Sequence, residues 1–450
     1  MPALRPGIIF ALVEKQRRIL LASTVGLFAL CAALWSLATP PFESPDETGH
    51  ARYVNFLLEY RRLPVAGRDA PGEAHQPPLY YALAASVAYV SGLGPVALEP
   101  RRNPAFRWYG GREENKYSHD GDESPPLAGS ARSLHWLRLL SVAMGMATVL
   151  LVHFMGSGTG DLLAPSMAAA MAAFIPQFTF ISGCLNNDNL ASLLAAATLA
   201  CLARAMSRPG RLELWAGAGI FAGLALLTKF TALTLLPCGL VALWLARSCG
   251  PARITRAAAA FLAPALALPA PLFLRNLLVM GDPLGAAAQV ETLPHLLDRK
   301  ALVSSYFVGE MPAVLFRSFW GTFGWMSLKL PGVLYAMALV LTAAAVFGLF
   351  AMRRDDVTRR LHTLLAAAIA IQLVQIVIYN LSFTQAQGRF LFPVIGPICI
   401  LMCAGLLQAA RGLRLPALSP RGAGVLVAGM AAANLCILRF ILVPAYYLKP

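Results

Sequence analysis

The stretch Pro40-Pro41-Phe42-Glu43-Ser44-Pro45-Asp46-Glu47-Thr48-Gly49-His50 directly follows the first long apolar run of this 450-residue chain. That run, about residues 19–38, has close to the roughly 20 residues that a helix needs to cross a bilayer. Basic residues at positions 5, 15, 17 and 18 precede it, so the positive-inside rule places the N-terminus in the cytoplasm. The two adjacent carboxylates and the histidine are then expected on the outer face, where group transfer needs a lipid-borne or otherwise activated donor.

The composition indicates a polytopic membrane protein. Hydrophobic residues make up 58% of the chain, charged residues 13%, and the mean hydropathy is +0.62. The net charge of +15 comes from Lys and Arg between apolar runs, which sets orientation and favours anionic membrane lipids. No basic stretch carries the interleaved aromatics of a nucleic-acid-binding module, so nucleic acid is not an expected partner. The eight cysteines contain no Cys-x-x-Cys pair, which favours a packing role.

Basic clusters divide the chain into spans. We place them in the cytoplasm at the N-terminus and at 204–211, 247–256, 353–360 and 411–421. The fold expected is an all-α polytopic membrane protein with about eleven transmembrane helices. They lie near 19–38, 133–155, 162–182, 189–206, 213–229, 231–247, 257–279, 331–352, 361–382, 390–410 and 422–443. An odd number of crossings places the C-terminus on the outer side, which is periplasmic for a bacterial inner membrane.

A single transmembrane domain, 1–450, then carries two outer loops, 39–132 and 282–330. Counting 77–98 as a further span would put the later basic loops on the wrong side. We therefore expect an interfacial helix there, a position that suits the paired tyrosines at 80 and 81. If 77–98 does cross, another predicted span is false, most readily near 156–161.

Charged residues at the outer ends of the spans are the candidates for chemistry. If 46–56 is helical, Asp46, Glu47 and His50 share one face, and a carboxylate there could act as a general base. The alternative is an ordinary acidic helix cap. Asn186-Asn187-Asp188-Asn189 is a turn that could return a second carboxylate to the same face.

Several cations lie at the same membrane face. Lys229 lies between two apolar stretches, where a lysine costs about 2.5 to 3.5 kcal/mol and is usually paired or functional. Arg389 follows Gln387 at an outer end, where it needs an anionic partner. His75, Arg138 and Arg275 are weaker members of this group. Such convergence suits a substrate with a phosphate at headgroup level and an apolar tail.

On these residues the chain resembles the GT-C superfamily of membrane glycosyltransferases, whose donors are polyprenyl-phosphate-linked sugars. The likeness is closest to the protein O-mannosyltransferase and aminoarabinose transferase branch, and to predicted bacterial membrane proteins with a Pro-Asp-Glu-x-x-His loop. The matching pieces occur in the expected order: Pro45-Asp46-Glu47 with His50, His75-Gln76-Pro77-Pro78-Leu79-Tyr80-Tyr81, Leu137-Arg138, Asn187-Asp188, Thr228-Lys229, Arg275-Asn276 with Gly281-Asp282-Pro283-Leu284, Trp320-Gly321, Phe323-Gly324-Trp325 and Gln387-Gly388-Arg389-Phe390.

The resemblance implies an inverting glycosyltransferase on the outer face of the cytoplasmic membrane, in a GT-C-like fold. It implies that Asp46 is the base, Glu47 its neighbour and possible substitute, and Asp188 a second acidic position. The donor phosphate would contact Arg389, helped by Lys229 or Arg138, with His75 and Gln387 beside them. His50, Asn187, Arg275 and Asn276 are further site candidates. The acceptor, a lipid, a glycan or a protein, and the sugar are not indicated.

Metal dependence and other functions stay open at this stage. The oligosaccharyltransferase branch uses a divalent metal held by acidic motifs, and Asp120-Gly121-Asp122 is the nearest match, in a stretch interpreted as solvated surface. No cofactor is therefore certain, and a divalent cation is possible. The alternatives are a lipid-linked-sugar transporter or flippase, an O-antigen ligase or polymerase, and a non-catalytic assembly protein.

Overall fold

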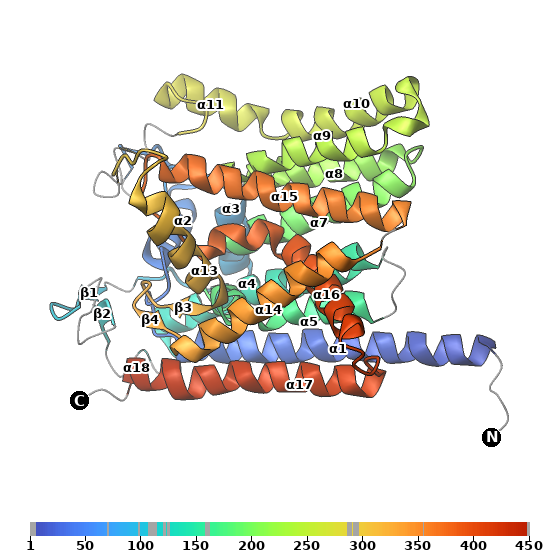
Figure 1. Cartoon of the computed structure of the whole chain (residues 1–450). Coiled ribbons are helices and arrows are strands. Elements are labelled where there is room, and N and C mark those ends of the chain that lie inside the picture. The colour runs from blue at the N-terminus through green and yellow to red at the C-terminus, as the bar shows by residue number, and fades with distance from the viewer. Residues whose placement is uncertain are drawn as a thin grey trace.

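The apolar segments form long helices, because a helix satisfies every backbone polar group inside a hydrocarbon layer. The computed structural model describes residues 6–69, 72–97, 100–106, 115–119, 123, 127–157, 163–285, 290, 297–353 and 355–447, with side chains from residue 14 onward. The long helices of this part of the chain run roughly along a common direction (Figure 1). This arrangement is that of a multi-pass membrane protein, as the composition predicts.

Among the described residues, eight helices are long and apolar enough to cross a membrane. They are α1 (Pro6–Ala38), α4 (Gly129–Gly156), α7 (Asp188–Ser207), α10 (Pro251–Ala267) with α11 (Ala270–Met280), α14 (Gly332–Ala351), α15 (Asp356–Asn380), η6 (Gly388–Val394) with α16 (Ile395–Gly412), and α17 (Pro420–Ile437) with η7 (Leu438–Leu442) and α18 (Val443–Tyr447). A bent pair, α5 (Ala164–Phe174) and α6 (Pro176–Ser182), makes a ninth if it counts as one span; its axes meet at 67°. Shorter apolar helices are α3 (Leu79–Val90), α8 (Leu212–Leu226), and η2 (Phe230–Thr234) with α9 (Leu235–Leu245).

Each of the segments that the sequence predicts to span the membrane is helical. Eight or nine of them have the length to cross, whereas α8 and the η2–α9 pair are shorter, so the number of crossings stays a prediction. The helix α3 has 12 residues, which extend roughly 18 Å and fall short of the ~30 Å hydrocarbon core. That length agrees with the interfacial position expected for it. The alternative turn near 156–161 falls mostly outside the described residues, since 158–162 are not among them.

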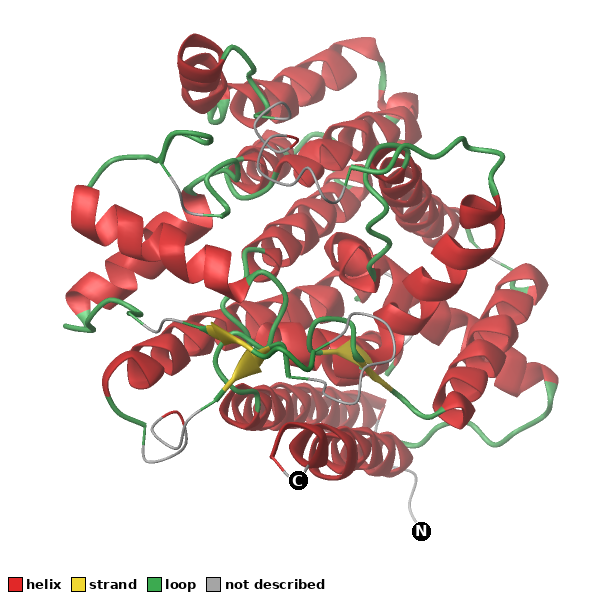
Figure 2. Ribbon diagram, turned by 90° about the vertical axis from the view of Figure 1, so that its left-hand side faces the viewer, coloured by secondary structure: helices red, strands yellow, loops and turns green. Residues whose placement is uncertain are grey.

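Short elements gather at one end of the helical bundle. These are α2 (Glu47–Tyr60), α3, α13 (Met311–Gly321) after the π-turn η5 (Tyr306–Glu310), and two small antiparallel sheets. The sheets pair β1 (Arg101–Arg102) with β2 (Tyr117–Ser118) and β3 (Thr322–Phe323) with β4 (Leu328–Lys329). Figures 1 and 2 show them on the face that also holds the C-terminus, while α1 begins at the opposite end. The single turn η3 (Arg247–Cys249) connects α9 to α10.

Tight crossings and an apolar outer surface characterise the bundle. Where α14 crosses α16, a Cβ atom on Gly405 would lie 2.0 Å from the carbonyl oxygen of Ala345, so only glycine fits there. Small residues allow such close backbone approach between membrane helices. The outer side of α14 exposes Phe347 and Phe350, at 72% and 88%, as a lipid-facing surface does. The cysteines are free thiols, and most of them are buried, in keeping with a packing role.

Candidate active site

The chain turns sharply at Asp46, between the end of α1 and the start of α2. Asp46 is the N-cap residue of α2, with φ 64° and ψ 0°, in the left-handed region that non-glycine residues rarely adopt. Its side chain makes no capping hydrogen bond to the helix. Instead, Oδ2 accepts a hydrogen bond of 2.5 Å from Nη2 of Arg389, and the side chain stays 34% exposed. Of the two interpretations of this residue, the geometry favours a site carboxylate over a helix cap.

Four charged side chains from four separate segments form a row of ion pairs, here called the charged row: Asp46, Arg389, Asp188 and Lys229. Arg389, in η6, also lies 3.3 Å from the Oδ2 atom of Asp188 through Nη1. Asp188, the first residue of α7, accepts a hydrogen bond from Nζ of Lys229, which lies in the break between α8 and η2. The row is largely buried, with Arg389 at 5% and Asp188 at 6% exposure. Charges that are buried need an oppositely charged partner. The sequence predicts all four residues at one membrane face.

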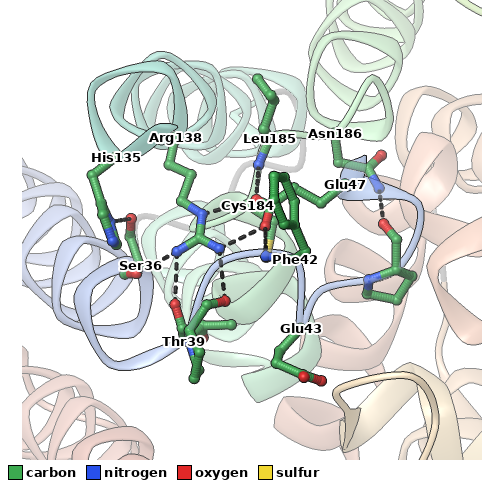
Figure 3. Close-up of polar contacts among 12 residues, drawn as sticks. Ser36, Thr39, Phe42, Glu43, Glu47, His135, Arg138, Cys184, Leu185 and Asn186 are labelled. Atoms are coloured by element: carbon green, nitrogen blue, oxygen red, sulfur yellow. Dashed lines mark hydrogen bonds and ion pairs between the residues drawn. The ribbon is translucent and has the colours of Figure 1, made fainter. Parts of the chain in front are cut away.

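Glu47 and Arg138 form a second, fully enclosed ion pair (Figure 3). Both side chains have 0% exposure. Arg138 donates from Nε and Nη2 to the Glu47 carboxylate at 2.8 and 2.6 Å, and its remaining N–H groups bond the carbonyl oxygens of Ser36, Thr39 and Pro40. Glu47 also accepts from two backbone N–H groups, those of Phe42 and Leu185.

These contacts contradict two predictions from the sequence. All five N–H groups of Arg138 are used, so none is left for a donor phosphate. Glu47 has no exposed surface through which an acceptor hydroxyl could reach it. The pair instead ties α4 and α2 to the end of α1 and to the turn before α7, and so holds the backbone around Asp46 in place.

Neutral polar side chains surround the charged row. Nδ1 of His50 lies 2.9 Å from the hydroxyl of Tyr81, and burial lowers the pKa of His50 to about 4. Burial lowers the pKa of His75 to about 4 as well, and its Nε2 lies 3.0 Å from the side-chain nitrogen of Gln76. Asn187 donates to Oε1 of Gln76 at 3.4 Å. Both histidines are therefore uncharged near neutral pH and serve as hydrogen-bonding groups.

Three further site candidates form hydrogen bonds with nearby backbone and side-chain groups: Arg275, Asn276 and Gln387. Arg275 donates to the carbonyl oxygens of Leu63 and Pro64, at 3.2 and 3.0 Å, and so holds the loop that follows α2. Asn276 accepts from Arg275 and donates to the carbonyl of Pro283. Gln387 accepts from Nε of Arg389 at 2.6 Å, which orients the guanidinium toward the two carboxylates. Arg275 and Asn276 thus contact loops beside the site rather than the charged row.

Glu73 is a third carboxyl group beside Asp46 that sequence reasoning missed. Its Cγ atom would lie 2.8 Å from a Cβ on Gly49, so the glycine lets Glu73 pack against α2. Burial, together with the Asp46 carboxylate, raises the pKa of Glu73 to about 8. Burial also opposes ionisation of Asp46, but the Arg389 guanidinium outweighs it and lowers the pKa of Asp46 to about 2. At neutral pH one of these neighbouring carboxyl groups is therefore charged and the other is protonated.

Lys116 and Trp325 lie beside the loop that leads to Asp46. Nζ of Lys116 is 3.0 Å from the centroid of the Trp325 ring, a cation–π contact. Trp325 in turn donates from Nε1 to the carbonyl of Phe42 at 2.9 Å. Trp325 belongs to a motif quoted from the sequence, but nothing in the spacing of the chain pairs it with Lys116.

The described part of the chain holds no group of three or more His, Cys, Asp or Glu side chains placed to share a metal ion. Asp120 and Asp122, the nearest match to a metal motif in the sequence, lie outside the described residues. A divalent cation stays a prediction.

Comparison with known proteins gives a family and a fold. Residues 129–397 match a protein-family model described as "Predicted membrane protein (DUF2142)". No curated protein matches the chain. The oligosaccharyltransferase AglB of Archaeoglobus fulgidus, solved with an inhibitory peptide and a dolichol-phosphate, is similar in fold, with a TM-score of 0.53 and 14% identity over 95% of this chain and 56% of that one.

ArnT of Cupriavidus metallidurans is similar as well. Bound to undecaprenyl phosphate, it has a TM-score of 0.50 and 14% identity over 94% of this chain and 74% of that one. Its apo form has a TM-score of 0.51 and 12% identity over 94% and 73%. This chain spans about half the length of the archaeal enzyme. These structures are GT-C enzymes, and the chain described here has the GT-C fold.

Proposed function

The chain belongs to the DUF2142 family of predicted membrane proteins, and we propose that it is an inverting glycosyltransferase that moves a sugar from a polyprenyl-phosphate donor to an acceptor hydroxyl. The observation that carries this proposal is the charged row at one end of a GT-C bundle. In it, a carboxylate that is about one-third exposed pairs with Arg389, and Asp188 joins Arg389 to Lys229. AglB and ArnT were each solved with a polyprenyl-type lipid phosphate, which supports a donor of this chemistry. The site then faces the outer side of the cytoplasmic membrane, as the basic clusters predict.

The reaction proposed is a single displacement. The acceptor oxygen attacks the anomeric carbon as Asp46 takes its proton. The bond between that carbon and the phosphate oxygen breaks, and its electron pair leaves with the polyprenyl phosphate. Asp46 suits the base because its carboxylate is ionised and its side chain is accessible.

Arg389 links donor binding to the strength of this base. Without a donor, its guanidinium pairs with Asp46 and holds the pKa of that carboxyl at about 2, which makes it a weak proton acceptor. A donor phosphate that takes hydrogen bonds from Arg389 removes this counter-ion from Asp46. The pKa of Asp46 then rises toward its ordinary range, so the base gains strength when the donor is bound.

The phosphate would lie between Arg389 and Lys229. These two cations flank Asp188, which contacts both and keeps them apart. Arginine offers two parallel N–H groups to a phosphate, and lysine a point charge. Negative charge that builds on the departing phosphate oxygen is then met by preorganised donors, the kind of stabilisation that often dominates catalysis.

The test measures release of free polyprenyl phosphate by mass spectrometry. Wild-type protein, Asp46→Asn and the matched control Glu59→Gln, an exposed position on the same helix, are placed in nanodiscs with polyprenyl-phosphate sugars and an envelope extract as acceptor source. We expect release by wild type and by Glu59→Gln, and a loss of about 100- to 10,000-fold in Asp46→Asn. The donor consumed identifies the sugar.

Two other outcomes have defined meanings. Release of polyprenyl phosphate by Asp46→Asn at the wild-type rate would show that Asp46 is not the base. In liposomes, movement of intact donor between leaflets by both proteins, without release of lipid phosphate, would establish the flippase alternative instead.

A further inference from the structure

A basic cavity lies at the end of the bundle opposite to Asp46. It has a volume of about 380 Å³ and lies between the end of α9 and the start of α15. Its lining includes Trp244, Arg247, Ser248, Arg359, Arg360 and Thr363. The helix α15 has 25 residues, so its ends are about 37 Å apart, roughly the thickness of a bilayer. Its far end, Asn380, bonds the backbone N–H of Gln385, near Arg389, so the cavity is separate from the candidate active site.

The cavity has more positive charge than the residues around it neutralise. Arg359 pairs with Asp356 at 2.6 Å. Arg247 donates one hydrogen bond, to the carbonyl of Trp244, and its guanidinium lies 4.1 Å from the centre of that indole ring. Arg360 is half-buried and has no side-chain hydrogen bond or ion pair with any residue that the structure describes. Two guanidinium groups thus retain free N–H donors toward one cavity.

The donors around the cavity match a phosphate. Guanidinium groups bond phosphate oxygens in pairs, and the hydroxyl group of Ser248 adds a single donor. The hydroxyl of Thr363 already donates to the carbonyl of Arg359, at 2.8 Å, and can only line the cavity. These groups come from two segments of the fold, the α9–η3 end and the first turns of α15. A ligand there bridges the two segments.

An exposed apolar stripe continues from the cavity along α9. Trp244 is 56% exposed, and Leu240, four residues earlier on the same face, is 53% exposed. A tryptophan at this depth is typical of the boundary between headgroups and acyl chains. A free phosphate ion would make no use of such a surface, whereas a lipid would place its acyl chain along it. Basic cavities between membrane helices commonly hold anionic headgroups.

We propose that this cavity binds the phosphate group of an anionic phospholipid, with an acyl chain along Leu240 and Trp244. The lipid lies in the leaflet opposite to the candidate active site. The volume suits a headgroup, because ligand cavities range upward from about 300 Å³. This inference does not depend on the proposed glycosyl transfer, and it fails or holds independently of it.

The test is a lipid titration followed by native mass spectrometry. The purified, delipidated protein is titrated with phosphatidylglycerol and, separately, with phosphatidylcholine of the same acyl chains. The test variant is Arg247→Gln with Arg360→Gln. The matched control is Arg253→Gln with Arg256→Gln, two exposed arginines on α10 at the same end of the bundle, which carry the same change in charge. Circular dichroism checks that all three proteins are folded.

We expect wild type and the control to prefer phosphatidylglycerol, and the test variant to bind it at least about tenfold more weakly. Equal affinity of wild type for the two lipids, or wild-type affinity in the folded test variant, would overturn the proposal. A third titration adds inorganic phosphate alone. Displacement of phosphatidylglycerol by millimolar phosphate would show a free-anion site and overturn the lipid assignment.

Discussion

Two adjacent carboxylates, Asp46 and Glu47, pair with two different arginines and have different surroundings. Asp46 is about one-third exposed and contacts Arg389, which has a further carboxylate neighbour. Glu47 is fully enclosed, and its partner Arg138 has every N–H group bonded. A pair whose donors are saturated can hold the backbone but can bind nothing further. We therefore propose that Asp46 carries the chemistry and that Glu47 has a positioning role.

This assignment predicts that Glu47→Gln lowers stability more than Asp46→Asn does. Removing one partner of an enclosed ion pair leaves an uncompensated charge, which costs about 3 to 5 kcal/mol. Thermal unfolding of the detergent-solubilised protein measures the effect, with Glu59→Gln as an exposed control on the same helix. A Glu47→Gln protein as stable as wild type that has lost transfer would make Glu47 a catalytic group after all.

A second residue-scale prediction concerns His119. Its Nε2 lies 3.0 Å from Glu43, and its Nδ1 lies 2.6 Å from Glu123. Glu43 also accepts from the backbone N–H groups of Lys116 and Tyr117, so the cluster holds residues 115–119 against the loop before Asp46. Burial opposes protonation of His119, but the two carboxylates outweigh it and raise its pKa to about 9 from an ordinary 6.5.

Because the pKa of His119 is raised in the folded protein, its charged form contributes full stability below about pH 6.5. That contribution is lost as the pH rises through about 9. We expect hydrogen exchange of amides 115–119, corrected for intrinsic rates, to accelerate between these values. The amides of β3 and β4, at the same end, serve as the internal control. Unchanged protection at pH 9.5, or the same acceleration in His119→Gln, would contradict the prediction.

The sequence predicted the residues of the charged row for a physical reason. A charge within or beside an apolar run needs a partner, and Lys229 and Arg389 stand out on that ground. Asp188 stands out because its turn could return a second carboxylate to the face that holds Asp46. Glu73 and Lys116 lie in a polar loop, where a charged residue is unremarkable, and only the folded chain brings them beside Asp46 and Trp325. Likewise, no pattern in the sequence distinguishes the saturated Arg138 from the bridging Arg389.

At the scale of elements, apolar runs located the helices but not their bends. The predicted span 162–182 is two helices, α5 and α6, whose axes meet at 67° at Pro176. A proline lacks the N–H that would continue the α5 hydrogen-bond ladder, which explains the bend. A count of hydrophobic residues over a window contains no information on such geometry.

The crossing of α14 and α16 gives an element-scale prediction. A Cβ at Gly405 would lie 2.0 Å from the carbonyl oxygen of Ala345, which is backbone and cannot move alone. Gly405→Ala should therefore force the helices apart and destabilise the protein by about 1 to 3 kcal/mol. Gly429→Ala on α17, where a Cβ meets nothing within 4 Å, should gain up to about 1 kcal/mol of helix stability. Thermal unfolding in detergent measures the stability of the two variants. Equal stability of Gly405→Ala and Gly429→Ala would show that α14 and α16 can move apart without cost.

At the scale of the whole molecule, the two ends of the bundle differ in chemistry. One end holds the short sheets and the C-terminus, and the other holds the start of α1 (Figure 1). The charged row lies at the first end, and the basic cavity, between the end of α9 and the start of α15, lies at the second. The arginine clusters recognised in the sequence mark the second end. Their asymmetry predicts an orientation, with the charged row outside and the cavity in the cytoplasm.

Cysteine labelling in spheroplasts tests this orientation. Ser118→Cys is exposed in β2 near the charged row, and Ser207→Cys is exposed at the far end of α7. Both are made in a Cys436→Ser background, because Cys436 is an exposed thiol. A membrane-impermeant maleimide should label Ser118→Cys in intact spheroplasts, and Ser207→Cys only after permeabilisation. The reverse pattern would place Asp46 in the cytoplasm. Soluble nucleotide sugars are available there, and the reason for assigning a polyprenyl-phosphate donor would be lost.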